Sequence, residues 1–257
     1  MTPSTLVRLV LAMIALTIIQ VAILLQFDWF GDAASDEAHP IDTLFDVMIV
    51  LSSFVFAIVL VMLGYAIWKY RAKPGDESDG EPIHGNTKLE IAWTAIPTVI
   101  VVAGAIYSWI VLDDIEAKAD DAMRVNVTAQ QFKWTFEYPD EGLQANELHA
   151  PVGRQLELHL TALDVIHAFW VPEWRIKRDL VPAGVGGDEI DNEVVVTPDE
   201  EGTYSVVCTE LCGLGHATMR AVAVVESQQE FDQWLNERQQ AATGGSTAGG
   251  GSEDGGT

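Results

Sequence analysis

Residues 208–219 read CTELCGLGHATM. This stretch holds both cysteines of the 257-residue chain, Cys208 and Cys212, followed by His216 and Met219. Thiolate, imidazole and thioether groups suit copper or zinc and suit calcium or magnesium poorly. The thioether favours copper, because zinc sites use Cys, His and carboxylate ligands. The ligands are too closely spaced for a strand, so we predict a loop wrapped around a metal, between a strand that ends at Cys208 and one that begins near Arg220.

The second cysteine distinguishes this pattern from a mononuclear blue copper site, which uses one Cys, two His and a weak axial Met. The extra thiolate allows both sulfurs to bridge two copper ions, each of which needs one histidine and one weak axial ligand. His216 can supply a histidine, Met219 one axial ligand, and the backbone carbonyl of Glu210 the other. A disulfide outside the cytoplasm or a structural zinc site is the alternative. The disulfide leaves His216 and Met219 unexplained, and the zinc site leaves Met219 idle.

The second histidine must come from elsewhere in the chain. Residues 164–172 read DVIHAFWVP and place His167 at the end of an apolar strand, among aromatic residues that would exclude water. His149 and His159 are weaker candidates. His149 precedes a proline in an expected turn, and His159 falls on the polar side of an alternating strand.

The region from residue 119 onward is dense in strand signals. Residues 132–138 place an aromatic side chain at every second position, and Pro-, Gly- and Asp-rich turns separate the strands. Short strands at this spacing predict an antiparallel sandwich or Greek-key barrel. One helix, 227–240 with Ser227 as its N-cap, is expected after them, and the Gly- and Ser-rich tail 243–257 is expected to be disordered. The predicted strands are 123–130, 132–138, 155–162, 193–197, 202–208 and 220–226.

Three apolar segments precede this region: residues 6–27, about 45–68, and 91–112. Each is near the roughly 20 residues that cross a bilayer as a helix. Lys and Arg cluster between the second and third segments, which predicts that this loop is cytoplasmic and that everything after Asp113 lies outside the cytoplasm. The first segment is read either as a retained helix or as a signal peptide with a weak cleavage site at 32–35.

The chain is strongly acidic, with 38 Asp and Glu against 14 Lys and Arg and a formal net charge of −24. This excludes nucleic acid as a partner, since phosphate binding needs clustered basic residues. The acids spread over the whole soluble region, which favours adaptation to high salt, as in a halophilic organism. An acidic docking face for a basic partner is the alternative.

The chain resembles subunit II of the haem–copper cytochrome c oxidases over about residues 40–235. The motif at 208–219 is similar to the run that holds the family's binuclear copper A centre. The segments 90–97 (EIAWTAIP), 131–138 (QFKWTFEY) and 164–172 also match. The resemblance implies a membrane helical hairpin followed by a cupredoxin-like Greek-key sandwich. We therefore expect an N-terminal apolar segment and linker (1–40), the hairpin (41–118), the copper domain with its terminal helix (119–242) and the tail (243–257).

The resemblance also implies roles for single residues. Cys208 and Cys212 would bridge two copper ions, and the remaining copper ligands would be His167, His216, Met219 and the Glu210 carbonyl. The Glu210 side chain would reach a magnesium ion shared with the catalytic subunit. Glu90 would stand at the mouth of a proton path into that subunit, although an acid at the start of a helix also interacts favourably with the helix dipole.

The implied function is a one-electron relay in a multi-pass membrane protein with its copper domain outside the cytoplasm. Electrons would pass from a soluble donor through copper to haem in subunit I, where oxygen is reduced to water and protons are translocated. The family's quinol-oxidising relatives lack the copper ligands that this chain has. No Cys-x-x-Cys-His motif occurs, so no haem c is expected on this chain.

The sequence departs from the family at Phe132, where the family usually has the tryptophan through which electrons enter. Phe132 would then serve as a contact surface, with Trp134 nearer the metal. The donor is expected to be a cytochrome c or a small blue copper protein with an apolar docking patch. At 1 M salt the Debye length is about 3 Å, so steering by charge would be weak.

Two rival functions are an oxidoreductase of another kind, which uses a similar copper loop, and a copper-binding protein. One is the electron-accepting domain of a nitrous oxide reductase, against which the membrane hairpin and the lack of a second, His-rich domain argue. The other is a membrane-anchored copper chaperone, which would bind a single copper ion reversibly. A purely structural assembly subunit would hold no metal at all.

Overall fold

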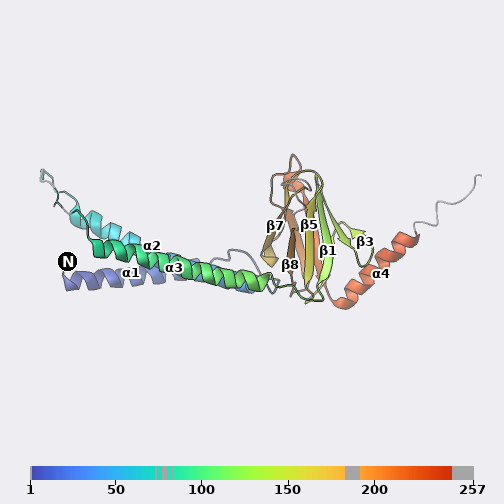
Figure 1. Cartoon of the computed structure of the whole chain (residues 1–257), viewed down its shortest axis with the longest axis horizontal. Coiled ribbons are helices and arrows are strands. Elements are labelled where there is room, and N and C mark those ends of the chain that lie inside the picture. Colours follow the sequence, from blue (N-terminus) through green and yellow to red (C-terminus); the bar gives the residue numbers. More distant parts are fainter. Residues whose placement is uncertain are drawn as a thin grey trace, which may run out of the picture. The chain divides into compact units, whose positions relative to one another are not determined.

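Figure 1 shows the computed structural model of the chain. The structure describes residues 2–72, 74–76, 80, 82, 84–182 and 192–244. The chain divides into two compact units. The first is Met1–Trp29 with Ile41–Asp113, and the second is Phe30–Pro40 with Asp114–Thr257.

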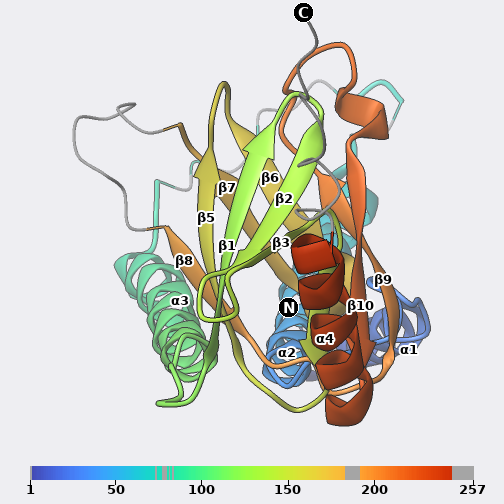
Figure 2. The ribbon, with the colours of Figure 1, turned by 90° about the vertical axis from the view of Figure 1, so that its right-hand side faces the viewer.

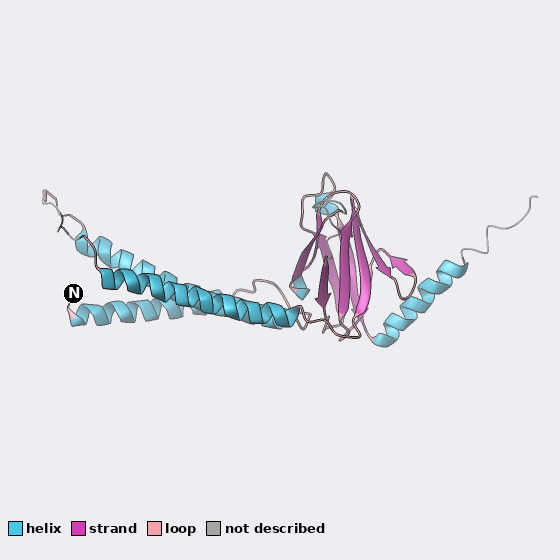
Figure 3. Ribbon diagram, in the orientation of Figure 1, coloured by secondary structure: helices cyan, strands magenta, loops and turns pink. Residues whose placement is uncertain are grey.

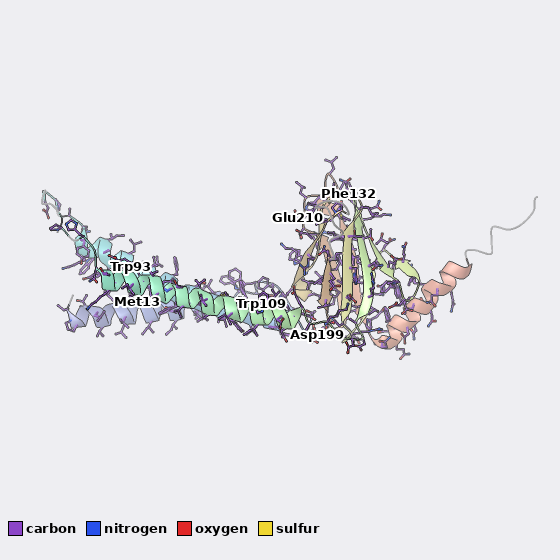
Figure 4. The ribbon with its side chains drawn as sticks, viewed as in Figure 1. Met13, Trp93, Trp109, Phe132, Asp199 and Glu210 are labelled. Carbon is purple, nitrogen blue, oxygen red and sulfur yellow. The ribbon has the colours of Figure 1, made fainter. Side chains whose placement is uncertain are left out.

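The first unit consists of three helices, α1 (Pro3–Leu24), α2 (Ala38–Tyr70) and α3 (Thr87–Ile115), whose outermost residues at two ends belong to the second unit. Each is long and apolar enough to cross a bilayer, so the prediction of three apolar helices is confirmed. Their large side chains are widely exposed, as for Trp93 and Trp109 on α3, labelled in Figure 4. Such apolar surface needs lipid or partner subunits to cover it.

The second unit is built from two five-stranded sheets, drawn in magenta in Figure 3. The strand orders are β3-β2-β1-β5-β8 and β4-β10-β9-β6-β7, and Figure 2 shows the two sheets face to face. The strands are β1 (Met123–Gln130), β2 (Lys133–Tyr138), β3 (Leu143–Ala145), β4 (Leu148–Pro151), β5 (Leu156–Ala162), β6 (His167–Val171), β7 (Ile176–Leu180), β8 (Glu193–Val196), β9 (Gly202–Cys208) and β10 (Arg220–Glu226).

The sandwich is mixed rather than purely antiparallel. β1 pairs with β5 in parallel, and β4 pairs with β10 in parallel, while the other pairs in both sheets are antiparallel. The expectation of an antiparallel sandwich was therefore incomplete, because spacing along the chain does not reveal which strands pair across a crossover.

The alternating pattern of the predicted strands is confirmed in the core. Val125, Val127 and Ala129 of β1 are fully buried, and so is Phe136 of β2. Phe132 is the exception among the alternating aromatics. It precedes β2 and is 39% exposed, because the β1–β2 connection turns at residues 131–132 before pairing resumes at Lys133.

The terminal helix α4 (Gln228–Gly244) begins as the sequence predicts. The Ser227 hydroxyl accepts a hydrogen bond from the Glu230 backbone N–H, and the Glu230 carboxylate accepts one from the Ser227 N–H, which forms a capping box. Figure 1 shows α4 starting at the end of the sandwich away from the loop between β9 and β10. Residues 243 and 244 belong to this helix, and the rest of the expected disordered tail lies outside the described residues.

The segment Phe30–Pro40 adds to the sandwich like a short edge strand. Ser35 forms a bridge with Pro198, and the Ala34 N–H donates to the Glu173 carbonyl at 2.9 Å. The Glu37 carboxylate accepts hydrogen bonds from the backbone and hydroxyl of Thr197. This linker is therefore an ordered part of the second unit.

Tyr138 ties β2 to β4 inside the core. Its hydroxyl donates to the His149 carbonyl at 2.8 Å and accepts from the His149 N–H at 2.6 Å. Burial raises the pKa of this hydroxyl, which keeps it protonated and able to donate. Its ring also packs edge-on against Trp234 of α4.

Replacing Tyr138 by Phe should destabilise the sandwich by about 1–3 kcal/mol, because two buried backbone groups lose their partner. The measurement is thermal unfolding of the purified full-length chain in detergent, followed by near-ultraviolet circular dichroism. Tyr204→Phe is the matched control, since that hydroxyl makes one exposed hydrogen bond to Glu200. Equal unfolding temperatures for the two variants would contradict the role given to Tyr138.

Candidate metal centre

Pairing of β6 with β9 brings the two parts of the predicted site together. Phe169 of β6 lies opposite Cys208, the last residue of β9, so His167 reaches the same end of the sheet. The loop that follows contains a short 3-10 helix, His216–Thr218. It closes where the Cys208 N–H donates to the Met219 carbonyl at 3.3 Å, beside the start of β10. The expected loop between two strands is thus present.

The two cysteine sulfurs lie 3.8 Å apart and form the centre of the cluster. His167 Nδ1 is 3.8 Å from Cys208 Sγ, and His216 Nδ1 is 3.7 Å from Cys212 Sγ. Met219 Sδ is 3.7 Å from Cys212 Sγ. The sixth group is the Glu210 carbonyl oxygen, 3.3 Å from Cys208 Sγ. All six groups named from the sequence therefore converge, and the two halves each contain one sulfur, one imidazole and one weaker donor.

The cluster is largely shielded from water. His167 and Met219 are fully buried, and both cysteines are less than 5% exposed. The Trp134 ring stands edge-on to His167, with ring centroids 6.4 Å apart, and also packs against Phe169. Trp134 therefore lies beside His167, one of the candidate ligands. Outside this shield, His216 is half-buried and the Glu210 side chain is exposed.

The chemistry of the donor set fits a cation. Burial raises the pKa of the Cys212 thiol to about 11, and the neighbouring Cys208 sulfur adds to the shift. Two thiolates this close in a buried site need positive charge between them. Without metal the Cys212 thiol stays protonated at neutral pH, and a bound copper ion would displace its proton.

The Asp164 carboxylate supports a candidate ligand, His167, and the ligand pattern in the sequence did not indicate this role. Its Oδ1 accepts from His167 Nε2–H at 2.9 Å, and its Oδ2 accepts from the Gln131 N–H at 2.7 Å. Partial burial alone would raise the pKa of Asp164, but the hydrogen bonds from Gln131, His167 and Val165 lower it to about 2. The carboxylate therefore stabilises the fold above pH about 4, and this is lost as the pH falls toward 2. Its position three residues before His167 was the available signal.

The other two histidines weighed from the sequence do not join the cluster. His149 Nδ1 lies 3.0 Å from Glu226, and its ring stacks on Trp234. His159 Nε2 lies 2.9 Å from Glu157. Both are engaged with carboxylates elsewhere on the sandwich.

Phe132 and Glu210 lie at the same end of the sandwich, as labelled in Figure 4. The Phe132 ring covers the loop so closely that a Cβ atom built on Gly215 would lie 2.5 Å from it. Glu90 sits in the first turn of α3, where its carboxylate accepts from the Asn86 N–H at 3.1 Å. The Asn86 side chain accepts in turn from the Leu89 N–H, so Glu90 takes part in a helix cap.

Comparison with known proteins identifies the family. The description "Cytochrome C oxidase subunit II, transmembrane domain" matches residues 22–111, and "Cytochrome C oxidase subunit II, periplasmic domain" matches residues 142–227. The chain belongs to the cytochrome c oxidase subunit II family. It is thus a subunit of a terminal oxidase complex, with apolar helices for the membrane and an extracytoplasmic domain.

The relatives of this chain include subunits of cytochrome c oxidases and subunits of quinol oxidases. Cytochrome c oxidase subunit 2 of Synechocystis sp. is 33% identical over 261 residues, covering 80% of this chain and 77% of the relative. Quinol oxidase subunit 2 of Bacillus cereus is 31% identical over 205 residues, covering 75% of this chain and 66% of the relative. Among solved structures, the periplasmic domain of cytochrome oxidase subunit II of Bradyrhizobium japonicum is 28% identical, covering 49% of this chain and 98% of that chain, with a TM-score of 0.43. The three apolar helices, the two-sheet sandwich and the two family models together confirm the expected fold class.

Replacing Asp164 by Asn should lower copper affinity about tenfold, because the His167 ring loses the charged acceptor that orients it. The measurement is competition with a copper chelator of known affinity. Asp199→Asn is the matched control, since Asp199 also pairs with a histidine, His39 at 3.0 Å, at the other end of the sandwich. If both variants bound copper equally well, the hydrogen bond to His167 would carry no such role.

Proposed function

We propose that this chain holds a binuclear copper centre on residues 208–219 together with His167, and relays single electrons to the oxygen-reducing subunit of its oxidase. When bound, the copper pair would supply a one-electron site that accepts from a soluble donor and delivers to haem in subunit I. The observation that carries the proposal is the pair of sulfurs 3.8 Å apart with an imidazole and a weak donor on each side. Family membership supports the partner subunits and the reduction of oxygen.

Each residue of the centre has a separate task in this proposal. Cys208 and Cys212 would hold the metal as thiolates, and His167 and His216 would each add an imidazole nitrogen. The Met219 thioether and the Glu210 carbonyl would be the weaker donors. The buried aromatic Trp134 keeps water from His167, and a dry, fixed ligand set changes little in geometry when an electron arrives.

The presence of all six donor groups favours an oxidase that accepts electrons from a soluble protein. Some relatives are quinol oxidase subunits. By the resemblance to the oxidase family, quinol-oxidising members lack the copper ligands, whereas the sequence of this chain has a matching residue at each of those positions. A chaperone reading is disfavoured because two shared sulfurs suit two metal ions rather than one that is released.

The donor is proposed to be a cytochrome c or a small blue copper protein that docks mainly through apolar contacts. Leu211 is 83% exposed, Leu214 is fully exposed, and Phe132 is partly exposed beside the loop. The net charge of −24 supports a protein adapted to high salt, where attraction between charges is screened within about 3 Å at 1 M. The donor can be identified by comparing how fast purified cytochrome c reduces the copper centre with how fast a blue copper protein from the same cells reduces it.

Two further assignments belong to the same proposal. The exposed Glu210 side chain is a candidate ligand for a magnesium ion shared with subunit I, because hard carboxylate oxygens suit that ion. Glu90 is a candidate for the mouth of a proton path into the same subunit, coupling the chain to proton translocation.

The first test is electron paramagnetic resonance with copper quantitation on the full-length chain loaded with copper. We expect two copper ions per chain and a seven-line hyperfine pattern, which arises when one unpaired electron is shared by two copper nuclei. His167→Ala should abolish that pattern, whereas His159→Ala, the matched control, should leave it intact. One copper ion with a four-line pattern would favour a chaperone, and no retained copper would leave an assembly role.

The role of Glu90 can be separated from helix capping by Glu90→Gln. Glutamine also accepts a hydrogen bond from the Asn86 N–H, so α3 should be unaffected. If Glu90 carries protons, oxygen consumption by the assembled oxidase should fall about tenfold or more, since glutamine cannot ionise. Lys88→Gln on the same turn is the control. Unchanged turnover in Glu90→Gln would leave Glu90 as a cap only.

A further inference from the structure

We infer that Gln131 is a positioning residue that ties the cysteine loop to the His167 side of the metal centre. The inference rests on the proposed copper site but concerns a residue that is not a ligand. Gln131 makes two hydrogen bonds, one with its backbone and one with its side chain. They run to different halves of the site.

The first hydrogen bond supports the histidine half. The Gln131 N–H donates to Asp164 Oδ2 at 2.7 Å, and the other oxygen of that carboxylate accepts from His167 Nε2–H. Nε2 is thereby occupied, which leaves His167 Nδ1 to face Cys208 Sγ at 3.8 Å. Gln131 therefore helps to fix which ring nitrogen is offered to the metal.

The second hydrogen bond supports the cysteine half. Gln131 Nε2–H donates to the Cys212 carbonyl at 2.5 Å. Among the hydrogen bonds of the described residues, this one alone joins residues 210–215 to a segment outside the loop. The Cys212 sulfur contacts three other donor groups, as the Cys208 sulfur also does, so a shift of the Cys212 backbone would move the centre of the cluster.

The position of Gln131 is fixed by the β1–β2 hairpin. Gln130 pairs with Lys133 and Ala129 pairs with Trp134, which leaves residues 131 and 132 as the tip. A two-residue tip on a paired ladder has little freedom. The same hairpin carries Trp134, which packs on His167, so one rigid element touches both halves of the site.

The loop is shaped to receive this tip. A Cβ atom on Gly213 would lie 2.9 Å from Gln131 Nε2 and 3.2 Å from the Phe132 ring. Gly213 also has a φ of +133°, a backbone angle that residues other than glycine rarely adopt. Two glycines in the loop thus allow Gln131 and Phe132 to lie directly against it, with no room for a larger residue.

The test compares Gln131→Met with Gln130→Ala in the full-length chain. Methionine keeps the length and bulk of the side chain but removes the donor to Cys212, so loss of folding is not expected. Gln130 is the adjacent glutamine, and no side-chain hydrogen bond of Gln130 is among those that the structure describes. After reduction with ascorbate, we expect Gln131→Met to release copper to the Cu(I) chelator bathocuproine about tenfold faster, while Gln130→Ala matches the unaltered chain. In the oxidised protein we expect Gln131→Met to change the hyperfine splitting.

A second readout needs no copper. It is alkylation of the reduced chain in the absence of copper, because Cys212 is only 3% exposed in the structure. We expect Gln131→Met to raise the rate of its alkylation by iodoacetamide about tenfold over Gln130→Ala, because the loop is freed. An alkylation rate within twofold of the control would overturn the inference, whatever the copper content. An unaltered chain that binds no copper pair while the alkylation difference holds would overturn the proposed function instead.

Discussion

Two buried sulfur atoms 3.8 Å apart are the constraint on which the site depends. As thiolates they would repel each other strongly in a water-poor setting, so the arrangement is favourable only as two thiols or around cations. The raised pKa of the Cys212 thiol has the same origin, because burial and the neighbouring Cys208 sulfur both disfavour the thiolate. A fold that brings Cys208 and Cys212 together and then surrounds them with soft donors is therefore arranged for metal. The same arrangement of donor groups would not stabilise an ordinary hydrophobic core.

Strand pairing and the hydrogen bonds around the site fix different features of its geometry. Pairing of β6 with β9 sets how far His167 stands from Cys208. It does not set the rotation of the imidazole ring, which is left to Asp164, nor the path of the loop, which we assign to Gln131. Side chains fixed by packing and by a second layer of hydrogen bonds keep a redox site in one geometry through both oxidation states.

The convergence of the donor groups was predictable from sequence, because their residue types and spacing are typical of a site for a soft metal ion. Cys208, Cys212, His216 and Met219 lie within one loop, and His167 is the histidine set among aromatics. Strands β1, β9 and β10 were also predictable, because their alternation reports burial directly. The parallel pairing of β1 with β5 was not, since pairing across a crossover leaves no local signal.

The supporting residues escaped prediction for a related reason. Asp164 and Gln131 are common polar residues, and the contacts of Gln131 with Asp164 and Cys212 arise only when segments 33 and 81 residues apart meet. Phe132 followed the alternation of β2 but left the core at the hairpin tip. The linker Phe30–Pro40 had no strand pattern of its own, and its order comes from contacts with residues 173–199.

The exposed position of Phe132 bears on how electrons would reach the loop. One side of its ring lies against Gly215, and the other side faces solvent. Trp134, in contrast, is buried and packs against His167. Phenylalanine is difficult to oxidise, so it would act as a contact through which an electron tunnels and not as a stopping point. The quality of that contact then depends on how firmly the tip and loop are joined. The hydrogen bond from Gln131 to the Cys212 carbonyl adds a short bonded route from the same tip to Cys212, so the residue that positions the loop would also shorten the path into the proposed metal site.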